Sequence, residues 1–313
     1  MPICVFDIAK DGTTHVPSDT HLTGAARYRW WHFDASDPML PDWLATHLPD
    51  IPAGALMQAE TRPRCDAYVD GMMLNLRGIN LNTGQPADQM VSIRMWVADA
   101  VVITVRVRRV FAVEDLRQTA IAQQAPPSPS AFITALVTLL TGRIEGEVSQ
   151  IEKLTEFFEA DLEDDRTPPP VQLPATRRSV IRLRRYLEPQ RDALAALAVF
   201  GAPLIPEPEG LVLRELANRT TIVVEELDAL RERLITVQDD HDLDVARKQA
   251  RHGYVLSIAA GVFLPLGFLT GLFGVNVAGL PGLEDPRAFI ILCLSMVALA
   301  VATLGLLRWF RWL

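Results

Sequence analysis

The sequence predicts an α/β cytoplasmic domain with a long helical stalk, followed by two C-terminal transmembrane helices. Three observations predict this class. The last sixty residues contain two uncharged stretches of twenty residues each, proline clusters separate long amphipathic segments in the middle of the chain, and the first 125 residues hold short alternating or β-branched segments. A helix needs roughly 20 apolar residues to cross the hydrocarbon layer of a membrane.

Residues 1–125 are predicted to form a mixed α/β domain. Residues 91–97 alternate between apolar and polar side chains, and residues 100–107 are rich in β-branched side chains, which is typical of strands. Four further segments are weaker strand candidates: 27–34, 55–61, 65–69 and 72–76. The domain contains no glycine-rich phosphate loop and no nucleophile elbow, so the sequence does not predict an enzyme.

Residues 126–210 are predicted to form a helical layer of the same domain. Proline breaks helices, and clusters of proline bound two long segments here. Residues 131–166 carry an apolar stripe with helical spacing, and residues 174–200 carry a second one.

Residues 211–253 are predicted to form a stalk helix that continues into the membrane without a break. Its two heptad positions repeat as in a coiled coil. These positions hold Leu216, Thr220, Val223, Leu227, Leu230, Leu234 and Val237. The stripe turns polar at His241 and Asp244. A helix from Leu211 to Phe273 is about 95 Å long, which is too long to pack within one small domain.

Residues 254–313 are predicted to form a transmembrane hairpin with a short basic tail, with spans at about 254–276 and 288–307. Positive side chains lie outside the hairpin at both ends, with Arg251 before the first span and Arg308 after the second. Because cytoplasmic flanks carry an excess of arginine and lysine, both termini are predicted to lie in the cytoplasm.

The charge of the chain is divided between its two parts. The whole chain carries a net charge of −8, and the residues after 246 contribute +4, so the first 246 carry −12. Such a field repels nucleic acid and concentrates cations, although it also serves solubility alone. Three isolated cysteines (Cys4, Cys65 and Cys293) predict neither a disulfide framework nor a zinc finger.

The end of the first span carries a recognisable motif. Gly274-Val275-Asn276 follows Thr270-Gly271 and, further upstream, Phe263-Leu264-Pro265-Leu266. This sequence resembles the CorA-type divalent metal ion transporters, whose first span closes with Gly-Met-Asn. The layout agrees along the whole chain, whereas the motif-level agreement covers about residues 247–276.

Two departures point to one branch of that family. Valine stands at position 275 in place of the usual methionine, and the Met-Pro-Glu-Leu that commonly follows in the magnesium branch is missing. Both features are similar to the zinc-transporting ZntB branch. The resemblance implies a homopentamer in a bacterial-type inner membrane, with first spans around one central pore, stalks forming a funnel, no cofactor, and Zn²⁺ as the transported ion.

The first span predicts how an ion would pass. One helical face holds the candidate pore-lining residues, which are Gly253, Leu256, Ala260, Leu264, Gly267 and Gly271. The rival role of the two last glycines is close helix packing. Since the span contains no carboxylate, histidine or cysteine, the ion is expected to travel at least partly hydrated. A ring of Asn276 amides would then hold its water at the mouth; the rival role of Asn276 is a helix C-cap.

An acidic stretch precedes the first span. Asp240, His241 and Asp244 lie within about one helical turn and are candidate metal ligands at the inner end of the funnel, where His241 would also link transport to protons. The alternative is a solvated acidic stretch that balances the neighbouring basic residues.

Three functions compete at this point. The leading one is a zinc transporter, passive or proton-coupled. The second is a Mg²⁺ or general divalent cation channel on the same scaffold. The third is a membrane-tethered sensor or scaffold without conduction; the glycine-rich, uncharged first span favours conduction over tethering.

Overall fold

The computed structural model describes residues 1–17, 22, 24–59, 61–162, 171–200, 204–275, 280 and 285–309. The chain divides into two units, Met1–Gln238 and Asp239–Leu313. One helix, α6 (Glu207–Phe273), contributes residues to both of them.

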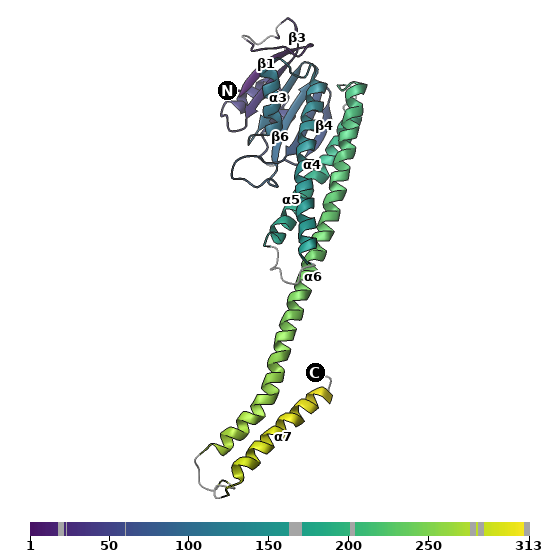
Figure 1. Cartoon of the computed structure of the whole chain (residues 1–313). Coiled ribbons are helices and arrows are strands. Elements are labelled where there is room, and N and C mark those ends of the chain that lie inside the picture. Colours follow the sequence, from purple (N-terminus) through teal and green to yellow (C-terminus); the bar gives the residue numbers. More distant parts are fainter. Residues whose placement is uncertain are drawn as a thin grey trace. The chain divides into compact units, whose positions relative to one another are not determined.

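The first unit is built on a seven-stranded mixed sheet (Figure 1), in which β3 and β7 pair in parallel and the other neighbours are antiparallel. The strand order is β2-β1-β3-β7-β6-β5-β4. The strands are β1 (Cys4–Ala9), β2 (Thr14–His15), β3 (Ala26–Asp34), β4 (Arg64–Tyr68), β5 (Gly71–Gly78), β6 (Val91–Ala98) and β7 (Val101–Arg106). The predicted strands at 91–97, 100–107, 27–34, 65–69 and 72–76 are thus confirmed.

Helices cover both faces of the sheet because successive strand residues point to opposite sides. One face packs against α1 (Leu40–His47) and α2 (Asp50–Met57) through residues such as Phe33 and Trp96. The other face packs against α3 (Phe111–Ile121) and α4 (Pro129–Leu162), and Trp30 meets Phe132 edge to face. The expected strand at 55–61 is wrong, since residues 55–57 end α2; a short apolar run does not distinguish a buried helix from a strand.

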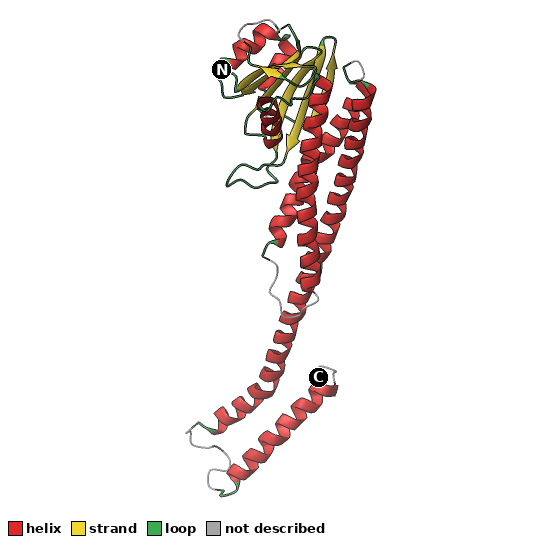
Figure 2. Ribbon diagram, turned by 45° about the horizontal axis from the view of Figure 1, so that its top comes forward, coloured by secondary structure: helices red, strands yellow, loops and turns green. Residues whose placement is uncertain are grey.

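Three long helices pack together in the same unit (Figure 2): α4, α5 (Leu173–Phe200) and the first part of α6. All seven heptad positions predicted for the stalk, from Leu216 to Val237, are buried. Their partners are apolar residues of α4 and α5, such as Ile151 and Leu187. The heptad stripe therefore serves packing within one chain.

Two arginine–glutamate pairs fasten α6 to α4. Arg219 Nε donates to Glu145 at 2.8 Å, and Arg233 Nε and Nη2 donate to Glu159 at 2.8 and 2.6 Å. Hydrogen bonds from Arg233 hold the pKa of Glu159 below its usual value. Because both pairs join residues 74 positions apart, they fix one register between the two helices.

His32 of β3 lies in the core as a neutral side chain. Its Nδ1 lies 2.8 Å from Thr104 Oγ1, which accepts from Trp30 Nε1 at 2.9 Å and donates to the Trp31 carbonyl at 3.1 Å. The Thr104 hydroxyl has one proton, so His32 Nδ1 is the donor to it. Burial lowers the pKa of His32 from 6.5 to about 4.

This histidine is expected to destabilise the fold in mild acid. The unfolded chain takes up a proton on this imidazole between pH 6.5 and 4, whereas the folded chain does not. The free energy of unfolding should therefore fall by up to about 3 kcal/mol as the pH drops through that window. Urea unfolding of the full chain at several pH values measures it. His32→Gln should flatten this dependence of stability on pH. His15→Gln, at an exposed position, should leave the dependence unchanged. Equal pH profiles for the unmodified chain and both variants would contradict the role of His32.

The second unit contains the two helices of membrane length. The end of α6 and all of α7 (Ala288–Trp309) are long and apolar enough to cross a membrane. The most apolar part of each helix contains no buried residue. Figures 1 and 2 both draw α7 alongside the end of α6.

Candidate functional site

The candidate pore-lining residues share an exposed face of α6. Gly253, Leu256, Ala260, Leu264, Gly267 and Gly271 are all exposed. The leucines are 72% and 76% exposed, although both are fully apolar. At 3.6 residues per turn, these six positions fall on one side of the helix. An exposed apolar face of this kind requires a partner or a membrane environment.

The opposite side of this part of α6 is partly covered. Ile258, Val262, Pro265 and Leu269 recur at intervals of three or four residues and are each less exposed than the lining face. On α7, Leu292, Met296 and Thr303 are covered to a similar degree. The second span thus lies against the side of α6 turned away from the candidate lining face.

Two glycines on the lining face leave room for a close neighbour. A Cβ added at Gly267 or Gly271 would meet no atom of this chain within 4 Å. Thr270 is tied back to the helix, since its hydroxyl donates to the Gly267 carbonyl at 3.0 Å. No contact within the described part of the chain therefore requires glycine at either position.

Gly274 closes the helix. Its N–H donates to the Thr270 carbonyl at 2.9 Å, one residue after α6 ends at Phe273. A Cβ at this position would lie 2.7 Å from the same carbonyl oxygen, so another residue would have to displace backbone. Glycine is required here by the tight closure of the span.

Gly274→Ala is accordingly expected to destabilise the end of the span by roughly 1–3 kcal/mol, the usual cost of local backbone strain. Thermal unfolding of the full chain in one detergent compares it with Gly305→Ala in α7, where an added Cβ meets nothing within 4 Å. The control should be neutral or slightly stabilising, because alanine favours a helix interior. A melting temperature for Gly274→Ala equal to that of the control would contradict the steric role of Gly274.

The remaining motif residues are only partly described. Val275 is 51% exposed beyond the helix end. Asn276, the predicted amide of the selectivity motif, lies outside the described residues, and so do the residues that follow it up to Gly279.

The predicted metal ligands before the span are not gathered into a site within one chain. The Asp244 carboxylate pairs with Lys248 Nζ at 2.6 Å, four residues further along the helix. Asp240 is exposed, and His241 is half-exposed. Among the residues that the structure describes, no group of three histidine, cysteine or acidic side chains is placed to hold a metal ion. Lys248 is one of the neighbouring basic residues that the alternative role of this stretch, the balancing of charge, involves.

Three comparisons with known proteins agree with this architecture. Residues 25–311 match the family model described as CorA-like Mg2+ transporter protein. The chain is 35% identical over 291 residues to the divalent cation transporter CmaX of Pseudomonas aeruginosa, covering 91% of this chain and 87% of that protein. It is 32% identical over 306 residues to the zinc transport protein ZntB of Pectobacterium carotovorum, covering 97% and 93%. The structure of full-length CmaX superposes with a TM-score of 0.87 at 32% identity, covering 99% of this chain and 98% of that one.

Proposed function

This chain belongs to the CorA-like Mg2+ transporter family and is a divalent cation transporter, not an enzyme, and from this premise we propose that the ion it carries is Zn²⁺. The ion passes along the exposed face of α6, inside a homopentamer. The observation that supports this pathway is that six uncharged positions, from Gly253 to Gly271, share one exposed face of α6, opposite its less exposed side.

The chemistry of this face supports a hydrated ion. Between Tyr254 and Phe273 the described chain offers only hydroxyls and backbone carbonyls as oxygen donors, and most carbonyls are used by the helix. Divalent ions need several oxygen, nitrogen or sulfur ligands, so an ion crossing here keeps most of its water. Leu256 and Leu264 then act as apolar constrictions that gate by wetting and drying, and Gly274, Val275 and Asn276 form the selectivity motif.

The orientation follows from the flanking charges. Arg247, Lys248 and Arg251 precede the span and Arg308 follows α7, so we place both termini in the cytoplasm of a bacterial-type inner membrane. In this arrangement the segments 1–125, 126–210 and 211–253 act as cytoplasmic domain, helical layer and stalk, and 254–313 as the membrane hairpin.

Ion selectivity has a direct test. Purified full-length chain in liposomes loaded with a zinc-sensitive or a magnesium-sensitive dye is exposed to Zn²⁺ or Mg²⁺, each with and without a pH gradient. Zinc influx above that of empty liposomes supports the proposal, and acceleration by an inward proton gradient supports coupling. Faster Mg²⁺ than Zn²⁺ flux would instead support the general divalent cation channel, which the name of the CmaX relative favours. If no divalent ion entered the liposomes, the remaining alternative would be a membrane-tethered sensor or scaffold without conduction.

The acidic stretch before the span adds a second proposal. Five copies of Asp240, His241 and Asp244 around one axis would concentrate cations at the pore entrance. His241→Ala combined with Asp244→Ala should lower zinc uptake about tenfold at low ionic strength and less at 0.15 M salt, where exposed charges are screened. Asp242→Ala, on a neighbouring face of the same turn, is the matched control. Unchanged uptake in the double variant would reject the role of these residues.

A further inference from the structure

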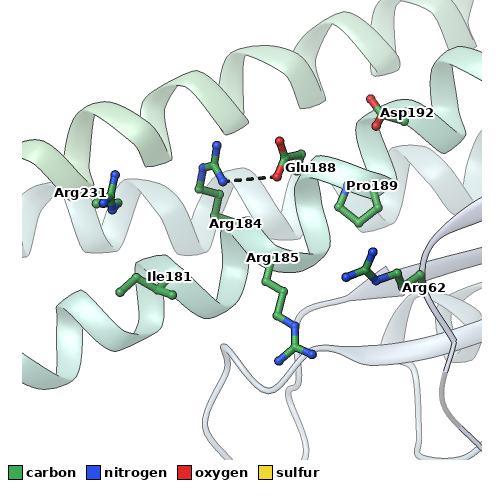
Figure 3. Close-up of a pocket in the computed structure, with 8 residues that line it drawn as sticks. All are labelled: Arg62, Ile181, Arg184, Arg185, Glu188, Pro189, Asp192 and Arg231. Atoms are coloured by element: carbon green, nitrogen blue, oxygen red, sulfur yellow. Dashed lines mark hydrogen bonds and ion pairs between the residues drawn. The ribbon is translucent and has the colours of Figure 1, made fainter.

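A basic pocket lies on the first unit, apart from the membrane helices. Its volume is about 690 Å³, which is within the range of small-molecule sites. Figure 3 shows that α5 supplies most of its lining, with Arg62 entering from the segment before β4 and Arg231 from α6. The lining residues are Arg62, Ile181, Arg184, Arg185, Glu188, Pro189, Asp192 and Arg231.

Two of the four arginines have no anionic partner among the residues that the structure describes. Arg184 is paired with Asp228 and with Glu188, and Arg231 with Glu232. Arg62 and Arg185 make no ion pair with any residue that the structure describes, and both are exposed; the Arg185 guanidinium lies 5.8 Å from the centre of the Tyr186 ring. The pocket therefore offers two guanidinium groups that come from different segments (Figure 3) and whose charge is not balanced by a described carboxylate.

Arg77 of β5 contacts the chain next to both of these arginines. The Arg77 guanidinium donates to the carbonyl of Thr61 at 2.9 Å and lies over the ring of Tyr186 at 4.0 Å. These contacts are to the residues directly next to Arg62 and Arg185. The backbone N–H of Arg77 also donates to Gln190 of α5 at 2.7 Å. Arg77 thus ties both sides of the pocket to β5 and adds a positive charge behind them.

The net charge of α5 is opposite in sign to that of the whole chain. This helix contains six arginines and two carboxylates, in a chain with a net charge of −8. Guanidinium groups bind phosphate through two parallel hydrogen bonds, which makes arginine the preferred residue for phosphate groups. The other side of the pocket differs, because Glu188 and Asp192, which pair with Arg184 and Arg191, can each accept further hydrogen bonds, and Ile181 and Pro189 offer apolar surface.

We propose that this pocket binds a nucleoside polyphosphate. Arg62 and Arg185 hold the phosphates, the carboxylates on the other side accept hydrogen bonds from the sugar hydroxyls, and the apolar residues contact the base. Nucleic acid would suit the same phosphates, but the net charge of −12 on the first 246 residues repels a long polyanion.

The test is a binding titration of full-length chain in detergent with ATP, ADP and pyrophosphate, without divalent ions. We expect saturable binding of ATP that is tighter than that of pyrophosphate. Arg62→Gln and Arg185→Gln should each weaken it about tenfold or more, the effect of losing one charge-assisted contact. Arg185→Lys should give an intermediate loss, because it keeps the charge and loses the paired hydrogen bonds.

The matched control is Arg178→Gln, which removes an exposed arginine of the same helix that does not line the pocket. It should bind ATP as the unmodified chain does. Absence of saturable ATP binding, or equal losses in Arg178→Gln and Arg185→Gln, would overturn the proposal. Equal affinities for pyrophosphate and ATP would overturn the assignment of a nucleoside. Because these measurements involve neither zinc nor ion flux, their outcome does not depend on the transport proposal.

Discussion

Leu256→Lys is expected to reduce divalent cation flux at least tenfold, whereas Leu256→Glu should maintain or raise it. If five copies of this side chain surround the pathway, five ammonium groups repel a divalent cation and five carboxylates attract it. Leu256 is 72% exposed in the single chain, and it lies near the start of the span, where a long charged side chain reaches the interface. Flux into dye-loaded liposomes is compared at equal protein content.

The opposite signs separate a pore from a lipid-facing surface. Val255 is the matched control, because it lies one residue away, is 59% exposed, and points about 100° away around the helix. Val255→Lys and Val255→Glu should affect flux similarly, through insertion and packing alone. If the Lys and Glu variants of Leu256 also behaved alike, the face from Gly253 to Gly271 would not line the pathway.

The sequence predicted the elements whose patterns are local. Residues 91–97 alternate along β6, and the stalk stripe from Leu216 to Val237 repeats every seven residues, so both were readable without a structure. β1 was not predicted, because Asp7 interrupts its apolar run. Asp7 is buried in an ion pair with Arg29 at 2.5 Å, and a partner 22 residues away leaves no periodic signal.

The same distinction holds for the candidate sites. The lining face of α6 follows from helical spacing and from the absence of charge, both of which are properties of one segment. The pocket beside α5 brings together Arg62, Arg185 and Arg231 from three distant segments, and no pattern in the sequence reports that meeting. The pairs that join α4 to α6 across 74 positions were missed for the same reason.

Asn276→Ala is expected to lower zinc flux about ten- to hundredfold while the protein still assembles. In the proposed pentamer, five amides accept and donate hydrogen bonds to the water around the ion, and one lost hydrogen bond to a charged group costs roughly 1.5–3 kcal/mol. The rival role is a helix C-cap, for which glycine is at least as good as asparagine. Gly274 already closes the last turn onto the Thr270 carbonyl at 2.9 Å, which reduces the need for a second cap.

Asn276→Gly therefore separates the two roles. A cap would be preserved by glycine, so flux would survive in Asn276→Gly and fall only in Asn276→Ala. A ring that holds hydration water loses its amides in both variants, so both should lose flux to the same extent. Asn276→Asp keeps one acceptor oxygen in the same place and adds a negative charge that attracts cations, so it should conduct and discriminate less between Zn²⁺ and Mg²⁺. Normal flux in Asn276→Gly would assign this residue to the helix end and leave the choice of ion to the apolar face of α6.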